Sequence, residues 1–236
     1  LAILVGGAVE IIPTLIVTEK VPVVITDEMV AANPALAESA KWMQKPYSPL
    51  EQAGRDIYVS EGCYVCHSQM VRPFRHEVLR YGEYSRLEES LFDHPFQWGS
   101  KRTGLDLARV GGKYDNLWHY LHLMDPRSTS PASNMPTYPH FKREKIDAAV
   151  VVTRMQALRR LGVPYTDDDI ALAEQRMASQ AQLIADDLAA KNVTVDPQSK
   201  MVAVIAYLQR LGRGPQPVAP APVLTADAGA PAAAKE

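Results

Sequence analysis

The two cysteines of this 236-residue chain lie close together, in the sequence Cys63-Tyr64-Val65-Cys66-His67. With only two residues between them they cannot cross-link distant parts of the chain, so they indicate local chemistry. The pattern C-x-x-C-H is typical of covalent haem c attachment. One helical turn places two thiols under the two vinyl groups of a haem, and the next residue delivers an imidazole to the iron. We therefore expect Cys63, Cys66 and His67 to bind one haem c, with His67 as the proximal iron ligand.

Two other sites share part of this pattern and stay open as alternatives. A dithiol redox pair favours a βαβ setting, whereas here a predicted helix precedes the motif and a loop follows it. A zinc site needs a fourth ligand, and the sequence contains neither a second CxxC nor an HxxxH pair. The pattern favours haem over both alternatives.

The sixth iron ligand of an electron-carrying haem is often a methionine sulfur. Met135 lies in the segment SNMPTYP (133–139), whose prolines favour an extended loop with few alternative conformations. Met70 is too close to His67 in sequence to reach the opposite face of a haem. We expect Met135 to be the distal iron ligand, with Met124 as its rival.

Basic residues gather in a glycine-containing stretch that follows Trp98. The charges of Lys101, Arg102 and Arg109 could bind the carboxylates of haem propionates. A plain surface loop explains each of them equally well, so their role stays a hypothesis.

Two histidines lie three residues apart, His119 and His122. They could form a metal pair or supply a bis-histidine haem. A solvated helix face is the favoured interpretation, because three-residue spacing is common on exposed helices.

A predicted helix leads directly into the cysteine motif. Ser48 can cap it, Pro49 suits its first position, and Glu51 completes a capping box. We expect the helix to run to about Ser60. The inward side chains should be Ala53, Ile57 and Tyr58, and the exposed ones Arg55 and Asp56.

The stretch between Ser68 and Pro139 is rich in Gly, Pro, Arg and aromatic residues and has weak periodicity. Loops of this length are uncommon unless something other than packed secondary structure holds them, and a large apolar cofactor would do so. Further helices are predicted over 142–161, over 166–191, and from 197 or 198 to 211. The inward positions of the first of these should be Ile146, Ala149, Val150 and Leu158.

The chain opens with an apolar run, LAILVGGAVEIIPTLIV, broken by Glu10 and Pro13. As a helix it would cover about 26 Å, slightly less than the ~30 Å core of a bilayer. We interpret residues 1–18 as a transmembrane anchor whose beginning is missing from this numbering, because no cleavage pattern of a secretory signal follows. A carboxylate at Glu10 would then face another membrane subunit.

Composition places the rest of the chain among ordinary soluble domains. A net charge of −2 with scattered Lys and Arg gives no basic field for nucleic acid, which excludes that class of partner. After the anchor (1–18) we expect a connector (19–46) with one short helix near 36–43. The haem domain should cover 47–212, and a Pro/Ala-rich tail without assigned function covers 213–236.

These motifs together resemble class I cytochrome c: a helix that ends at CxxCH, a T-G-x-x-L loop (103–107), an Asn-Met-Pro ligand loop and a final helix ending YLQRLG (207–212). More specifically, the chain resembles the membrane-anchored monohaem subunit of cbb3-type cytochrome c oxidase, CcoO or FixO. The segments that carry this resemblance are GCYVCHSQMVRP, YGEYSR, DHPFQWGSKRTG, DLARVGGKY, SNMPTYPH and VVTRMQALRRLGVPY.

The resemblance implies an all-α fold, a class I cytochrome c-like haem domain with an N-terminal transmembrane helix and an extra helical insertion. Its first and last helices should cross beside the haem, with Gly54 or Tyr58 against Tyr207. It also implies that His67 donates a hydrogen bond to the carbonyl of Leu105. Cytochromes c usually have proline at this position, so leucine makes the loop less rigid.

The resemblance further implies a non-catalytic electron-carrier subunit of a proton-pumping haem-copper oxidase. It would accept electrons from a dihaem cytochrome c subunit or a soluble cytochrome c, and pass them to low-spin haem b in the catalytic subunit, where oxygen is reduced. We expect a single-pass protein of the bacterial inner membrane, with its anchor in the lipid bilayer and its haem domain in the periplasm.

Other haem functions stay open. The cytochrome c subunit of a nitric oxide reductase is also monohaem and anchored once, although the segments WGSKRTG and LRRLGVPY argue against it. A haem-based ligand sensor would need an open sixth iron position, which ligation by both His67 and Met135 would not leave. A purely structural role for the haem is the third alternative.

Overall fold

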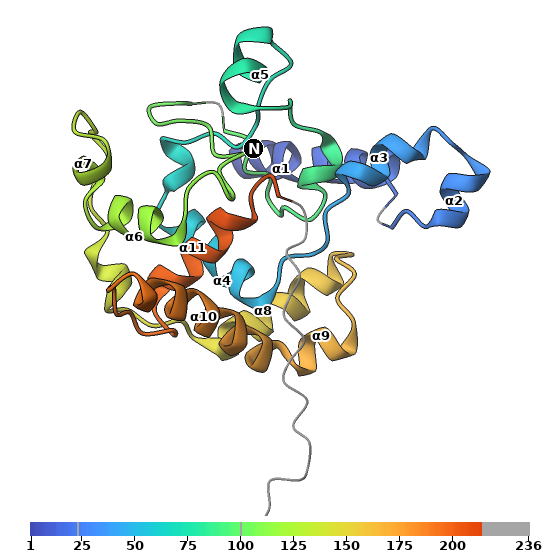
Figure 1. The fold of residues 1–236 in the computed structure, drawn as a ribbon. Coiled ribbons are helices and arrows are strands. Elements are labelled where there is room, and N and C mark those ends of the chain that lie inside the picture. The colour runs from blue at the N-terminus through green and yellow to red at the C-terminus, as the bar shows by residue number, and fades with distance from the viewer. Residues whose placement is uncertain (23, 100, 214–236) are drawn as a thin grey trace, which may run out of the picture.

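The computed structural model describes residues 1–22, 24–99 and 101–213, and the regular elements in these ranges are all helices (Figure 1). The only β-type pairing there consists of two isolated bridges, Gly111 with Tyr114 and Lys145 with Ser199. The predicted all-α class is therefore confirmed. Most of the predicted Pro/Ala-rich tail lies outside the described residues.

The helices follow one another from the N-terminus without a sheet between them. In order they are α1 (Ala2–Lys20), α2 (Asp27–Ala32), α3 (Leu36–Trp42), α4 (Pro49–Ser60), α5 (Arg75–Tyr81), α6 (Asn116–Met124), α7 (Pro126–Thr129), α8 (Ala148–Arg160), α9 (Asp167–Ala171), α10 (Ala173–Ala190) and α11 (Lys200–Arg210). Single 3-10 turns cover η1 (Cys63–Val65), η2 (Leu87–Ser90) and η3 (Pro139–Lys142). The short helix predicted in the connector is present as α3, and α2 is an additional one.

The helix before the cysteine motif, α4, begins as predicted. The Ser48 hydroxyl accepts a hydrogen bond from the backbone N–H of Glu51 at 3.3 Å, and the Glu51 carboxylate accepts one from the backbone N–H of Ser48 at 2.9 Å. This capping box satisfies two N–H groups that the first helical turn leaves without partners. The helix ends at Ser60, also as predicted.

The predicted exposure of Arg55 is wrong, because its side chain is only 3% exposed. Its Nε donates to the carboxylate of Asp93 at 2.8 Å, and its Nη2 donates to the carbonyl of Pro95 at 2.6 Å. A charge can be buried when it is paired and hydrogen-bonded in this way. Asp93 comes from a distant loop, so the helical pattern gave no sign of the pairing.

The centre of the fold is the crossing of α4 and α11, which share the most extensive helix contact among the described residues. A Cβ atom on Gly54 would lie 2.0 Å from the carbonyl oxygen of Ala203 and 2.8 Å from Cβ of Tyr207. Only glycine therefore allows the two backbones to approach this closely. The rings of Tyr58 and Tyr207 also pack together, with centroids 5.3 Å apart. Both expected contacts at the crossing are present.

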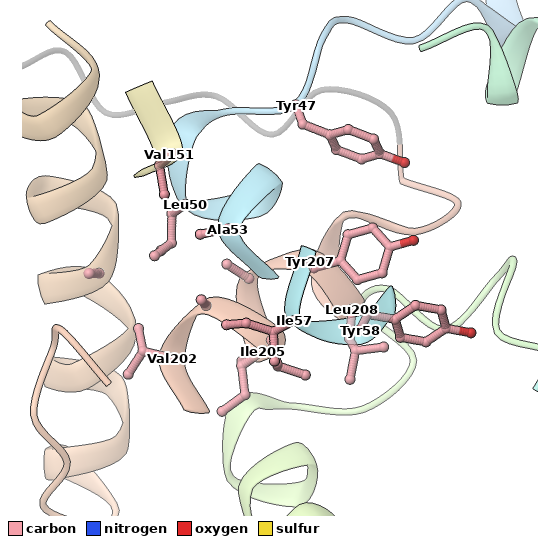
Figure 2. Packing of buried hydrophobic residues seen from close by; sticks show 14 of the residues in the cluster. Tyr47, Leu50, Ala53, Ile57, Tyr58, Val151, Val202, Ile205, Tyr207 and Leu208 are labelled. Atoms are coloured by element: carbon pink, nitrogen blue, oxygen red, sulfur yellow. The ribbon is translucent and has the colours of Figure 1, made fainter. Parts of the chain in front are cut away.

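Apolar side chains on both helices continue the core away from this crossing (Figure 2). Ile57 of α4 lies beside Ile205 of α11, and Leu50 and Val202 belong to the same buried cluster. Val151 adds a contribution from α8 beside Leu50. This core holds together segments more than 100 residues apart, so α11 is fixed against the helix that leads into the cysteine motif.

The helices after residue 139 are present, but their bounds differ from the prediction. α8 begins at Ala148 instead of residue 142, because Asp147 caps it by accepting the backbone N–H of Ala149 at 3.0 Å. The helix predicted over 166–191 is divided at Leu172 into α9 and α10.

The predicted inward face of α8 is also wrong in part. Ala149 and Val150 are exposed, while Val151, Met155 and Leu158 are buried. These three positions recur at helical spacing on a face about one residue away from the predicted one.

The predicted loop-rich stretch remains mostly irregular, although α5, η2, α6 and α7 lie within it. α5 projects from the rest of the domain (Figure 1). Its carboxylate Glu77 is nevertheless only 1% exposed, because it turns back toward the loops that follow the cysteine motif.

α1 forms where the apolar run predicts a helix, but the predicted transmembrane span is not found. Among the described residues, no helix is both long and apolar enough to cross a bilayer. α1 carries two carboxylates and a lysine among its 19 residues, which reduces its apolar character. Val17, near the end of the helix, is buried, and so is Val21 just after it. The side chain of Glu10 lies outside the described part of the chain. Its contact with another membrane subunit therefore stays a prediction.

Gly54→Ala should destabilise the folded domain. The added methyl group would overlap the backbone carbonyl of Ala203, which cannot rotate away. We expect the free energy of unfolding to fall by about 1–3 kcal/mol, as for other overpacked sites, measured by urea denaturation. Gly7→Ala is the matched control, because nothing lies within 4 Å of that position. Equal stability of the two variants would contradict the close crossing.

Candidate functional site

The cysteine motif forms one compact turn directly after α4. Gly62 reverses the chain with φ of 72°, in the left-handed region that favours glycine. The backbone N–H groups of Cys66 and His67 then both donate to the carbonyl of Cys63, at 3.2 and 3.0 Å. The two thiols and the imidazole are thus brought together on a single short turn at the end of a rigid helix.

The two thiols are both free, but their surroundings differ. Cys66 is exposed, whereas Cys63 is partly buried against the apolar core. Burial, with a contribution from the Glu61 carboxylate, raises the pKa of Cys63 to about 12. A dithiol redox pair depends on a stabilised thiolate, and the surroundings of Cys63 do not stabilise one.

The ring of His67 is oriented by a hydrogen bond from Nδ1 to the carbonyl of Leu105, 2.8 Å away. Burial lowers the pKa of His67, which favours the neutral imidazole. In the neutral ring, a proton on Nδ1 that is donated to a carbonyl leaves the lone pair on Nε2. His67 is thus prepared to bind a metal through Nε2, and the carbonyl that the resemblance implied is in place.

Gly104 packs directly against this ring. A Cβ atom at position 104 would lie 2.2 Å from Cε1 of His67 and 2.7 Å from both ring nitrogens. The backbone N–H of Gly104 also donates to the carbonyl of Cys66 at 2.8 Å. Glycine is therefore required here, because any side chain would displace the ring.

Met135 lies on a loop that is anchored at several points. Its backbone N–H donates to the Ser133 hydroxyl and its carbonyl accepts from Arg127, both at 3.2 Å. Further along the loop, His140 lies 3.3 Å from the carboxylate of Glu61, beside the cysteine motif. The loop thus returns to the end of α4. Met135 is partly buried against the core, and so is its rival Met124 at the end of α6.

Three basic residues were predicted as partners of haem propionates, and two of them, Arg102 and Arg109, bind carboxylates of the protein itself. Arg102 donates to the carboxylates of Glu77 at 2.8 Å and Asp106 at 3.3 Å. Arg109 pairs with the carboxylate of Glu89, with Nη2 to Oε1 at 2.7 Å. Lys101 is exposed. Arg102 and Arg109 thus hold loops together, whatever else they bind.

The predicted solvated face for the histidine pair is wrong for His119, which is only 2% exposed. Its Nε2 has no hydrogen-bond partner among the described residues, and burial lowers its pKa to about 4. His122 is half-buried and its Nδ1 lies 2.6 Å from the Thr129 hydroxyl. Burial lowers the pKa of His122, and His67 lies close enough to lower it further. The helix therefore presents His122 toward the site and His119 toward the core.

The sequence did not point to Asp106, which is 6% exposed beside the His67 loop. Its carboxylate accepts hydrogen bonds from the hydroxyl of Ser68 and the backbone of Met70. Its place between two apolar residues, Leu105 and Leu107, was the one available sign of burial.

The donor groups fit a haem. Two free thiols, a neutral imidazole with Nε2 left over and a thioether on a loop that returns to the end of α4 at His140 are the kinds of groups that attach and ligate haem c. Tyr64, Val65 and Leu105 are exposed apolar side chains in the two loops around His67, which suits an apolar cofactor. The described residues contain no group of three or more Cys, His, Asp or Glu side chains placed to hold a bare metal ion.

A comparison with protein families agrees with this donor set. The family model described as cytochrome C oxidase, mono-heme subunit/FixO matches residues 1–214, which include the whole site. No curated protein matches the chain.

Gly104→Ala should prevent correct placement of His67 and reduce covalent haem incorporation by about tenfold or more, because the methyl group overlaps the ring. Haem incorporation is measured from the ratio of haem absorbance to protein after expression with the haem-attachment machinery. Leu105→Ala is the matched control in the same loop, since it keeps the carbonyl that His67 uses. If both variants incorporated haem like the wild type, the packing of Gly104 would not matter for the site.

Proposed function

Because the chain belongs to the FixO family of mono-haem cytochrome c oxidase subunits, we propose that it is the electron-carrier subunit of a cbb3-type oxidase. It would hold one haem c in a class I cytochrome c-like domain, attached through Cys63 and Cys66. When bound, the haem supplies an iron that carries one electron by cycling between Fe(II) and Fe(III).

The observation that carries this proposal is the hydrogen bond from His67 of the CxxCH motif to the carbonyl of Leu105 in a separate loop. It leaves Nε2 of His67 available as the proximal ligand and fixes the orientation of the ring. A carbonyl partner on the other nitrogen also increases the basicity of a ligating imidazole. This arrangement suits a permanent iron ligand better than a histidine that exchanges protons with a substrate.

Met135 completes the proposed ligand set. A thioether on the distal side favours ferrous iron and raises the reduction potential, which suits a carrier in an oxidase chain. With both axial positions filled, substrate has no iron position to bind. The chain would therefore transfer electrons and leave oxygen chemistry to another subunit.

The partners follow from this role. We propose that electrons arrive from a dihaem cytochrome c subunit or a soluble cytochrome c and leave to low-spin haem b of the catalytic haem-copper subunit. The haem domain would lie in the periplasm at the bacterial inner membrane, where c-type haem is attached. The family match supports an oxidase over a nitric oxide reductase.

The reduced holoprotein should show a low-spin c-type absorption spectrum that carbon monoxide does not shift, because His67 and Met135 fill both axial positions. Spectra of the purified subunit with its haem attached, taken before and after carbon monoxide, make this test, because the catalytic subunit of the whole complex has a ligand-binding haem of its own. Identification by mass of the subunits in the purified membrane complex shows the partners. Ready binding of carbon monoxide to this haem would favour a ligand sensor. Copurification with the catalytic subunit of a nitric oxide reductase would overturn the oxidase assignment.

Met135→Ala should abolish the spectral features of His/Met coordination and lower the reduction potential by on the order of 0.1 V, because a softer ligand is lost. Potentiometric titration of the purified holoprotein measures the change. Met124→Ala is the matched control, since that side chain is also partly buried against the core. Loss of the methionine signature in Met124→Ala alone would move the distal ligand to Met124.

A further inference from the structure

A cluster of charged side chains lies behind the His67 loop and has no part in the proposed ligand set. Its carboxylates, Glu77 of α5 and Asp106, are buried, with 1% and 6% of each residue exposed. Its guanidinium groups are those of Arg102, whose side chain is 21% exposed, and of Arg72, which reaches the cluster from the surface with 49% of its side chain exposed. The two negative and two positive charges balance, so the cluster is neutral as a whole.

Asp106 is the member that joins the two loops around the histidine. One oxygen, Oδ2, accepts hydrogen bonds from the hydroxyl of Ser68 at 2.5 Å and from the backbone N–H of Met70 at 2.9 Å. The other oxygen, Oδ1, accepts the backbone N–H of Ala108 at 2.9 Å. The carboxylate thus connects the segment that follows His67 with the segment that follows Leu105.

Glu77 and Arg102 hold this carboxylate from behind. Arg102 donates to Asp106 at 3.3 Å, to Glu77 at 2.8 Å and to the carbonyl of Met70 at 2.7 Å. The backbone N–H of Arg72 donates to Glu77 at 2.9 Å. These contacts, led by the hydrogen bond from Arg102, lower the pKa of Glu77 to about 2, so Glu77 stays ionised at neutral pH.

Two backbone hydrogen bonds run beside the cluster. The N–H of Gly104 donates to the carbonyl of Cys66, and the N–H of Leu107 donates to the carbonyl of Ser68, both at 2.8 Å. The hydrogen bond between His67 and the carbonyl of Leu105 lies between these two backbone bonds in the order of both segments. Asp106 therefore braces the loop that presents the Leu105 carbonyl to the ring of His67.

We propose that Asp106 is a positioning residue that keeps the Leu105 carbonyl on Nδ1 of His67 and thereby sets how strongly His67 binds the haem iron. The proposal rests on the proposed function for its redox consequence. A well-placed carbonyl increases the basicity of the ligating imidazole, and a more basic ligand favours ferric iron. Loosening this carbonyl should therefore raise the reduction potential.

Asp106→Asn tests the proposal. The amide keeps the shape of the carboxylate, but its NH2 group replaces one acceptor oxygen. That NH2 group would face N–H or O–H groups that now donate to Asp106. The Nδ1 proton of His67 should exchange with solvent on the order of tenfold faster, as expected for loss of a charge-assisted hydrogen bond. NMR of the reduced holoprotein measures this exchange, and potentiometry measures the accompanying rise in potential. Unchanged exchange in Asp106→Asn would overturn the proposal.

Two further variants show whether Asp106 acts by positioning the Leu105 carbonyl or only through its charge. Ser68→Ala removes one donor to Asp106, together with the hydroxyl that accepts from Nε of Arg102 at 2.6 Å, without a change in charge. It should move exchange and potential in the same direction by a smaller amount. Glu77→Gln removes a charge from the same cluster but leaves the bonds from Asp106 to Ser68 and Met70, so exchange should stay near the wild-type rate. If Asp106→Asn fails to fold, Ser68→Ala decides alone.

Failure of the proposed function would look different. A wild-type protein that binds carbon monoxide or lacks a methionine ligand would contradict the electron-carrier role, yet its His67 proton would still report on Asp106. A rise in potential without faster exchange in Asp106→Asn, and no effect of Ser68→Ala, would show that Asp106 acts only as a charge.

Discussion

The hydrogen bond between His67 and the carbonyl of Leu105 is the interaction on which the arrangement of the site depends. It joins residues 38 positions apart, so it forms only if the two loops pair in one register. A shift of one residue would place a different carbonyl, or none, beside Nδ1. Gly104 makes this register possible, because the ring occupies the space where a side chain would be.

The crossing of α4 and α11 supports that register from the other side. The amide of Gln69, two residues after His67, donates to the hydroxyl of Tyr207 in α11 at 3.0 Å. The hydroxyl of Tyr47 donates to Asp93 at 3.0 Å, and Asp93 also pairs with Arg55 of α4. The segment after the cysteine motif is thus held between polar contacts to the last helix and the packed helices themselves. A rigid support of this kind suits electron transfer, which requires little rearrangement around the iron.

Local signals predicted the parts of the structure that depend on neighbouring residues. The cap of α4 at Ser48 and its end near Ser60 were predictable, because capping and periodicity act within a few residues. The all-α class followed from the resemblance to cytochrome c. The burial of Arg55 was not predictable, since its partner Asp93 comes from a distant part of the chain. The start of α8 was predicted too early, although its cap at Asp147 is a local contact.

The candidate site shows the same division. The motif identified Cys63, Cys66 and His67 directly, because attachment chemistry requires that spacing. The carbonyl of Leu105 could be expected only from the resemblance to cytochrome c. The burial of His119 and the role of Arg102 could not be anticipated, because basic and aromatic residues in a loop-rich stretch carry no periodic signal.

The neutral cluster of Glu77, Asp106, Arg72 and Arg102 is best understood as a constraint on geometry. Burying charged pairs costs desolvation energy that their attraction often only offsets, so apolar residues of similar volume could stabilise the fold equally well. Apolar residues could not, however, accept the hydroxyl of Ser68 and the backbone N–H groups of Met70 and Ala108 at once. Directional bonds from a carboxylate fix the relative position of two loops more narrowly than packing does. The cluster thus lies where narrow positioning matters most, behind the one carbonyl that orients His67.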